Sequence, residues 1–286
     1  MSDQADMLRR RLEEHNGKRG KVIAVTSGKG GVGKSNFSIN FAVGLAQERY
    51  RVLVIDFDIG MGNIHLLIGK SNRYTIADHF ERGVPLTDII EQGPGGVHYI
   101  GGGTGLTQLL SLSDRLFERF SAEFEQILGR YDYILMDMGA GVSDQSLQFM
   151  IAANEVFIIT TPEPTAITDA YSMMKFLTKQ AADIPFYLIC NRAPSYKNGE
   201  EVLTRLAGAA GKFLNKDVSR LGVIPDDSSV SRAVLRQVPF LELEPKARVS
   251  TALKQLQQSY LGNENKGTGQ ELSFMSKVRG YLFNRQ

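Results

Sequence analysis

The most specific stretch of this sequence is Gly28-Lys29-Gly30-Gly31-Val32-Gly33-Lys34-Ser35. It fits the pattern Gly-x-x-x-x-Gly-Lys-Ser/Thr, whose glycines let the backbone curl until successive N–H groups point at phosphate oxygens. An apolar run at 22–27 precedes it and a helical pattern begins at Ser35, so the loop lies between a strand and a helix N-terminus that attracts anions. We predict nucleotide contacts from residues 28–36, Asn36 included, with Lys34 on the β- and γ-phosphates and the Ser35 hydroxyl on Mg²⁺.

Strand and helix patterns alternate along the chain beyond this loop. Helical patterns include 114–128, where phenylalanines recur on one face, and 246–261, which follows Pro245. Several strand candidates are continuous apolar runs, as expected for parallel strands that are covered on both faces. We predict a doubly wound α/β fold over 22–262, with a mostly parallel sheet and helices on both faces. The strand candidates are 22–27, 52–57, 132–137, 155–161, 186–190 and 220–224.

Composition and charge exclude several classes of protein. Of the 286 residues, 42% are hydrophobic and 22% are charged, which suits a globular body and excludes a wholly disordered chain. No apolar run reaches the roughly 18 residues of a membrane span, and the N-terminus lacks the apolar core of a signal peptide. The single cysteine, Cys190, excludes an internal disulfide and paired-cysteine metal sites, so we expect a reducing, cytoplasmic setting. The net charge of +2 reflects a basic excess at the two ends, 1–21 and 263–286.

Aspartates close two of the expected strands on the edge that carries the phosphate loop. Asp56 and Asp58 end one strand, and Asp137 ends another. The carboxyl ends of parallel strands meet at one edge of the sheet, where a metal ion or an attacking water would bind. We therefore expect Asp58 and Asp137, together with Ser35, to serve the metal. Asp56 alternates to the other face of its strand and is expected to be structural.

The second lysine of the loop, Lys29, is not required by the general phosphate-binding pattern. Lys-Gly-Gly-Val-Gly-Lys-Ser resembles the deviant Walker A loop of the ParA/MinD family of dimeric ATPases. The resemblance implies a nucleotide sandwich of two subunits in which Lys29 reaches the partner's nucleotide, with Asp58 positioning the hydrolytic water and Asp137, Gly139 and Gly141 in switch II. The alternative is a solvated Lys29 that only raises the local potential. The catalytic residues expected of this slow, Mg²⁺-dependent ATP hydrolase are Lys29, Lys34 and Asp58.

Two further strand ends carry candidate base-binding residues. Asn191 and Arg192 follow one strand, and Pro225 and Asp226 follow the next. An asparagine amide offers one donor and one acceptor, which suit the edge of adenine. The resemblance to MinD-like ATPases assigns contact with adenine to these four residues. The Asn-Lys-x-Asp motif of GTPases is absent from the sequence, and we predict ATP as the nucleotide.

The last residues form an amphipathic segment after a Gly/Asn-rich linker at 263–270. On a helix within 271–286, apolar side chains form one stripe and basic side chains such as Lys277 lie beside it, which is typical of a helix on a membrane surface. Two copies in an ATP-bound dimer would bind lipid far better than one. The alternative is that the stripe packs on the protein's own domain. The stripe consists of Phe274, Met275, Val278, Tyr281, Leu282 and Phe283.

The first 21 residues form a charged leader with a small apolar face. A helix this short is marginal alone and would fold on a partner, whereas the alternative is a disordered leader. The stretch Asp3-Gln4-Ala5-Asp6-Met7-Leu8-Arg9 resembles the leader of the FlhG regulators, also called FleN or YlxH, which are MinD-like ATPases that control flagellar number and placement. The resemblance implies that the leader stimulates the signal-recognition-type GTPase FlhF and that the body meets proteins of the flagellar switch (C-ring). Lys175, Lys179 and Arg205 are candidate docking charges.

Three other functions use the same kind of fold. A DNA-segregation ATPase would need a basic surface on the body, but residues 22–262 carry a net charge of −2, which disfavours DNA as a partner. An iron–sulfur carrier would need paired cysteines. A metabolic P-loop ligase would need its own substrate pocket, and it would leave both end segments without a role.

Overall fold

The computed structural model describes residues 19–58, 64–102, 114–141, 144–263 and 274–283, and their core is an eight-stranded sheet. The strand order is β3-β4-β2-β5-β1-β6-β7-β8, and each neighbouring pair is parallel except β3 with β4. From β1 the chain runs to one side of the sheet through β2, β3 and β4, returns to β5 beside β1, and continues to the other side through β6, β7 and β8, which leaves a crevice at the carboxyl ends of the central strands. The strands are β1 (Lys21–Ser27), β2 (Val52–Phe57), β3 (Glu91–Gln92), β4 (His98–Ile100), β5 (Tyr133–Ala140), β6 (Glu155–Thr160), β7 (Phe186–Ala193) and β8 (Ser219–Pro225).

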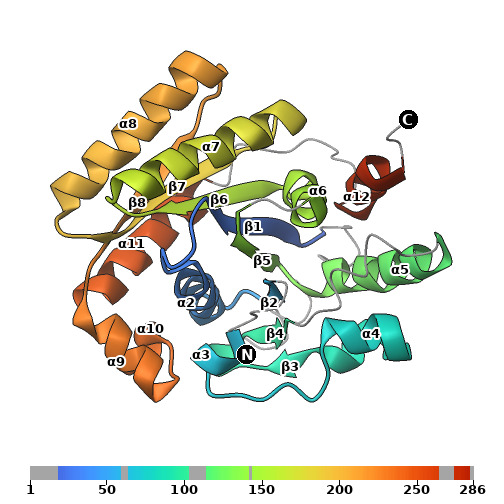
Figure 1. Ribbon diagram of the computed structural model, residues 1–286. Helices are drawn as coiled ribbons and strands as arrows, with labels where there is room; N and C mark the ends of the chain where they lie inside the picture. Colours follow the sequence, from blue (N-terminus) through green and yellow to red (C-terminus); the bar gives the residue numbers. More distant parts are fainter. Residues whose placement is uncertain (1–18, 59–63, 103–113, 142–143, 264–273, 284–286) are drawn as a thin grey trace.

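Helices cover both faces of the sheet (Figure 1). Successive strand residues serve opposite layers: Val22 and Ala24 of β1 face one layer, and Ile23 and Val25 face the other. One layer is covered by α4 (Ile76–Arg82), α5 (Asp114–Arg130), α6 (Asp144–Ala152), α7 (Pro164–Gln180), α8 (Tyr196–Leu214) and α12 (Phe274–Phe283). The other is covered by α2 (Lys34–Gln47), α3 (Ile64–Leu67), α9 (Ser228–Arg236), α10 (Phe240–Leu243) and α11 (Arg248–Asn263).

The predicted fold class is confirmed, and the sheet is wider than predicted. The sequence does not reveal β3 and β4, because runs of two and three residues carry no periodicity. The 3₁₀ turns η1 (Leu86–Ile89) and η2 (Pro94–Gly96) precede these two strands. β5 continues beyond its predicted end at 137, because it stays paired with β1 as far as Ala140 opposite Ser27.

The folded body begins earlier than its predicted limit at residue 22. Gly20 is buried and its N–H donates to the carbonyl of Leu128 at 2.7 Å. Lys21 is the first residue of β1, and its ammonium donates to Glu155 Oε1 at 2.8 Å. The same ammonium lies 5.4 Å from the ring centre of Tyr260, whose hydroxyl donates to Glu155 Oε2 at 2.6 Å. These contacts assign Lys21 to the body rather than to the leader.

The structure describes only part of the predicted linker and tail. α11 ends at Asn263, so the predicted linker loses its first residue to that helix, and the described part of the tail helix runs from Phe274 to Phe283, while 271–273 lie outside the described residues. The remaining linker positions and the leader motif at 3–9 lie outside the described residues.

The tail helix α12 packs on the protein's own domain. Phe274, Met275 and Val278 are buried, and α12 lies against α5 and α6, as Figure 1 shows. The ring of Phe274 is 5.4 Å from that of Phe124 and 6.2 Å from that of Phe149. We call the surface of α5 and α6 that these three residues cover the tail groove. Packing on the domain is therefore the observed arrangement of these three stripe residues, while the side chains of Leu282 and Phe283 lie outside the described part of the structure.

The rim of the tail groove is polar. Arg279 is exposed and pairs with Glu118 of α5 at 2.9 Å, while Tyr281 is partly buried against the apolar cluster. No helix in the described part of the chain is both long and apolar enough to cross a membrane.

Candidate functional site

The phosphate loop joins the carboxyl end of β1 to the first turn of α2. Gly31 and Gly33 have φ values of 79° and 89°, in the left-handed region that residues with side chains rarely adopt. A Cβ added to Gly31 would meet nothing within 4 Å, whereas one added to Gly33 would lie 2.4 Å from Asn191 Nδ2. The loop is therefore curled, closely packed on one side and open on the other, as a phosphate cradle at a helix N-terminus requires.

Lys34 and Asp137 form a buried pair beneath the loop. Their side chains are 8% and 1% exposed, and the Lys34 ammonium lies 3.4 Å from Asp137 Oδ1. Ser38 Oγ donates to the same oxygen at 2.9 Å. The other oxygen, Asp137 Oδ2, is buried and has no hydrogen-bond partner among the described residues. Such an oxygen is costly to leave unpaired, so it fits a cation or a cation-bound water.

The donor set next to the loop suits magnesium. Mg²⁺ prefers oxygen ligands and keeps several waters when it binds beside phosphates. The Ser35 hydroxyl in the first turn of α2 and the unpaired Oδ2 of Asp137 are oxygens of this kind. Within the described ranges, no group of three or more His, Cys, Asp or Glu side chains could hold a metal ion.

Asp56 holds the two ends of the segment that joins β2 to α3, residues 58 and 64. Its carboxylate accepts the N–H of Asp58 at 3.1 Å and the N–H of Ile64 at 3.2 Å. In the sheet it lies opposite Asp137. Burial, together with the nearby charge of Asp137, raises the pKa of Asp56 to about 6, although both hydrogen bonds oppose the rise. These contacts agree with the expected structural role, and residues 59–63 between them lie outside the described residues.

Asp58 lies against the predicted switch II segment beside the loop. A Cβ added to Gly139 would lie 3.2 Å from Asp58 Oδ1. Gly141 has a φ of 80°, and its N–H donates to the carbonyl of Ser27 at 3.2 Å. Gly139 still belongs to β5, so the predicted glycine turn begins only after Ala140, because β5 remains paired with β1 to that point.

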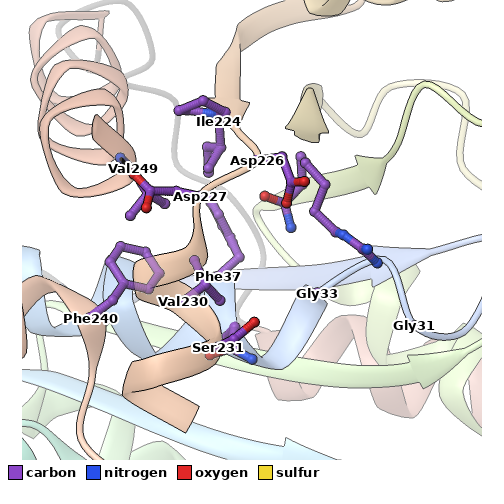
Figure 2. A pocket seen from close by; sticks show the side chains of 14 residues that line it. Gly31, Gly33, Phe37, Ile224, Asp226, Asp227, Val230, Ser231, Phe240 and Val249 are labelled. Carbon is purple, nitrogen blue, oxygen red and sulfur yellow. Dashed lines mark hydrogen bonds between the residues drawn. The ribbon is translucent and has the colours of Figure 1, made fainter. Parts of the chain in front are cut away.

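A cavity of about 320 Å³ opens beside the loop. Figure 2 shows Phe37, Val230 and Phe240 on one side of it and Asp226 on the side of the loop. Its volume and mixed walls suit a flat heterocycle held by a few polar groups. The four predicted base-binding residues all line it, namely Asn191, Arg192, Pro225 and Asp226.

Two features of this cavity are not predicted from the sequence. Asn191 Nδ2 donates to the carbonyl of Val32 at 2.8 Å, which ties the cavity to the phosphate loop. The helix α9 supplies Val230 and Ser231 to the lining. α9 begins after Asp227, whose carboxylate accepts the N–H of Ser229 at 2.9 Å. The Asp-Ser-Ser run after the strand at 220–224 is a capping signal that would have indicated this helix start.

Lys29 of the phosphate loop lies beside the start of α7 and is paired within its own subunit. Its ammonium donates to Glu163 Oε2 at 2.8 Å and to Thr165 Oγ1 at 3.1 Å. The hydrogen bond and charge of Lys29 lower the pKa of Glu163 from its usual value. No motif in the sequence around Glu163 indicates this partner. Its position after β6, on the edge that carries the loop, is the signal that could have found the pair.

Comparisons with known proteins show the family. A family model described as an AAA domain matches residues 20–184, more than half of the chain. The antiactivator FleN of Pseudomonas aeruginosa is 36% identical over 238 residues, which cover 83% of this chain and 85% of FleN. The chain belongs to the FleN/YlxH group of MinD-like ATPases. The flagellum site-determining protein YlxH of Helicobacter pylori is 34% identical over 82% of this chain and 80% of its own length.

The fold of this FleN/YlxH-type ATPase is shared with solved MinD structures. The septum site-determining protein MinD of Pyrococcus horikoshii, complexed with Mg-ADP, superposes with a TM-score of 0.70 at 24% identity, over 87% of this chain and 100% of its own. The predicted family and fold class are therefore both confirmed.

The sheet of this FleN/YlxH-type ATPase gathers the predicted phosphate-loop, acidic and base-pocket residues at one edge. The tail stripe is not part of that cluster, because α12 packs on α5 and α6. The leader residues Asp3, Gln4, Ala5, Leu8 and Arg9 lie outside the described residues.

Proposed function

We propose that this protein is a slow, ATP-driven switch that controls the number and placement of flagella. The observation that carries the proposal is the buried Lys34–Asp137 pair, with its unpaired Oδ2, beneath a curled phosphate loop. This arrangement fits a nucleotide with Mg²⁺. The flagellar role is supported by similarity over most of the chain to FleN and to the flagellum site-determining protein YlxH.

Each residue of the site has a chemical task in this proposal. The loop amides and Lys34 would hold the β- and γ-phosphates of ATP, while Ser35 and Asp137 would hold Mg²⁺. The bound Mg²⁺ neutralises charge on the phosphate oxygens. Asp58 orients the attacking water. Hydrolysis is slow because the site has no strong general base among its described residues.

ATP brings two subunits face to face in this scheme. Lys29 then contributes positive charge to the partner's nucleotide, as an arginine finger does. Asn191, Arg192, Pro225 and Asp226 hold the adenine in the cavity of Figure 2. The output is a change of oligomeric state and location.

The tail groove couples this switch to the membrane. α6 follows β5, which carries Asp137, and Phe149 of α6 packs on Phe274 of the tail. A shift of β5 and Gly141 on nucleotide binding would therefore move α6 under α12. Release of α12 exposes its apolar stripe together with Lys277, and two released tails in a dimer hold the protein reversibly on the inner face of the cell membrane.

Partner contacts complete the proposal. The leader motif of residues 3–9 stimulates the GTPase FlhF, which is supported by its resemblance to FlhG leaders. The C-ring proteins dock on the exposed sides of α7 and α8, where Lys175, Lys179 and Arg205 are exposed.

Co-sedimentation with anionic vesicles tests the membrane part. We expect the full chain to pellet with ATP and not with ADP, and we expect a 1–270 truncation to stay in solution. A full-length Tyr281→Glu variant keeps the docked residues of α12 and should also lose pelleting. Absence of pelleting in every state would exclude membrane binding.

Light scattering of an Asp58→Ala variant tests the dimer separately. This variant should retain ATP because the nucleotide is not hydrolysed, and its mass should double. Lys34→Ala is the matched control and should stay monomeric. An Asp58→Ala protein that remains monomeric with ATP bound would contradict the sandwich.

A further inference from the structure

Lys29 is held by its own subunit at the surface beside the phosphate loop. Its ammonium is 2.8 Å from Glu163 Oε2 and 3.1 Å from Thr165 Oγ1, and the lysine and glutamate side chains are 41% and 57% exposed. We propose that Glu163 is a positioning residue for Lys29, which holds the ammonium within the subunit until the phosphates of a partner subunit's nucleotide replace the carboxylate. This inference rests on the proposed sandwich of two subunits.

The fold builds this contact from two elements. Glu163 is the N-cap residue of α7, and Pro164 starts the helix, a position where the missing N–H of proline costs nothing. Gly28 brings the loop against the same helix, because a Cβ added to it would lie 2.2 Å from the carbonyl carbon of Asp169. The approach requires glycine at position 28. Lys29, the next residue, is thereby carried to Glu163.

The carboxylate competes with phosphate for the same donors. A lysine ammonium has three N–H groups, and Glu163 and Thr165 engage two of them. If Lys29 kept Glu163 while reaching a partner's nucleotide, a carboxylate and a phosphate would lie around one positive charge. Anions this close repel each other, and more strongly when subunits close and exclude water. The closed sandwich therefore requires Lys29 to leave Glu163.

Glu163 does not lose all compensation when Lys29 leaves. Arg192 also lowers the pKa of Glu163, after the larger effect of Lys29. Arg192 lines the base cavity as well. The guanidinium therefore remains as a counter-charge on the subunit's own side, so the exchange leaves no isolated carboxylate.

The magnitude of the effect follows from the exposure of the pair. An exposed ion pair changes an equilibrium constant by roughly two- to fivefold. Each closing event breaks two such pairs, one in each subunit. Removing the charge at position 163 should therefore tighten ATP-dependent dimerisation by about tenfold.

Sedimentation equilibrium in an Asp58→Ala background with saturating Mg-ATP measures this constant. We expect Glu163→Gln to lower the dimer dissociation constant about tenfold and Glu163→Asp, which keeps the charge, to remain near the parent. Glu125→Gln is the matched control, because Glu125 of α5 is partly exposed and forms an ion pair with the exposed Arg19, away from the loop, and its substitution should change nothing. The affinity of the monomer for ATP should be the same in all of these proteins.

The outcomes separate this inference from the proposed function. Damage to the fold would weaken dimerisation, so a gain on charge removal is a signature that a merely structural role of Glu163 would not give. An unchanged or weaker dimer in Glu163→Gln, with the parent dimerising normally, would overturn the inference alone. A parent that does not dimerise with ATP would instead overturn the sandwich itself.

Discussion

We call the phosphate loop with the carboxyl ends of β1, β2 and β5 the nucleotide edge. The nucleotide edge contains the end of β5 and the tail groove contains α6, the helix that follows β5, but the two regions are built in opposite ways. At the nucleotide edge, Asp137 of β5 buries an oxygen that has no partner among the described residues. At the tail groove, Phe274 packs between the rings of Phe124 and Phe149. The first site requires a ligand for its polar groups to be satisfied, whereas the second is satisfied by the chain itself.

This difference bears on the proposed coupling between nucleotide binding and release of α12 from the tail groove. Leaving a buried polar atom unpaired costs about 1–3 kcal/mol. Removing a large buried aromatic contact costs about 3–5 kcal/mol. Because the two quantities are of similar order, the proposed switch requires ATP to bind the state with a released tail more tightly by an amount of this size.

The substitution Lys34→Ala tests the nucleotide edge and should have the largest effect. The variant loses charge-assisted hydrogen bonds to two phosphates, so we expect ATP affinity to fall by about 4 kcal/mol, roughly a thousandfold. Calorimetric titration with Mg-ATP measures this, and hydrogen exchange over 274–283 in the absence of nucleotide should be unaltered. Lys212→Ala, an exposed lysine on α8, is the control. A loss below tenfold would contradict the assignment of Lys34.

The substitution Phe274→Ala tests the packing of α12 in the tail groove. The cavity left between Phe124 and Phe149 should weaken docking of α12 by about 3 kcal/mol, so its amides should exchange about a hundredfold faster. ATP affinity of the monomer should not fall. Gln255→Ala, at an exposed position of α11, should leave exchange over 274–283 nearly unchanged. Equal protection in both variants would show that packing at position 274 does not hold the tail.

Asp56 makes the free energy of unfolding depend on pH through a group at the nucleotide edge. Its pKa is about 6 in the folded protein against 3.8 as the usual value, so the folded state binds the proton more tightly than the unfolded state. Stability contributed by the protonated group is full below pH 3.8 and is lost as pH rises through 6. Relative to Asp56→Asn, the wild-type free energy of unfolding should fall by about 2 kcal/mol between pH 4 and pH 7. Urea unfolding without nucleotide measures this, and a rise would contradict the assignment.

The substitution Gly280→Ala should stabilise α12 and have the smallest effect of the four. A Cβ at this helical position would meet nothing within 4 Å, so alanine fits without strain. It should stabilise α12 by up to about 1 kcal/mol. Slower hydrogen exchange over 274–283 and less ATP-dependent vesicle binding are the expected results. Faster exchange would indicate that Gly280 has a role in docking that its open surroundings do not suggest.

Most of the nucleotide edge could be predicted from the sequence, because its chemistry requires fixed residue types at fixed spacing. Gly33, Lys34 and Ser35 have few substitutes in a phosphate loop. Asp58 and Asp137 follow from the rule that ligands bind where parallel strands end. The sheet itself follows from continuous apolar runs, except where β3 and β4 are too short to carry a pattern.

The contacts that were not predicted join residues far apart along the chain. Lys29 and Glu163 are 134 positions apart, and neither has a local signal that selects the other. The tail stripe indicates an apolar face at Phe274, Met275 and Val278, but the same face suits lipid and protein equally well. Its partner depends on where α5 and α6 place their phenylalanines, which only the folded chain specifies.

The contact among Lys21, Glu155 and Tyr260 determines where the two end segments join the body. It places the start of β1 beside the end of α11, so segments 1–18 and 264–273 join the body at neighbouring points. Those points lie a full strand length, about 20 Å, from the phosphate loop at the other end of β1. A partner bound by the leader, as proposed, would be tethered to the body at the end of β1 opposite the phosphate loop, where the second subunit of the proposed sandwich would close.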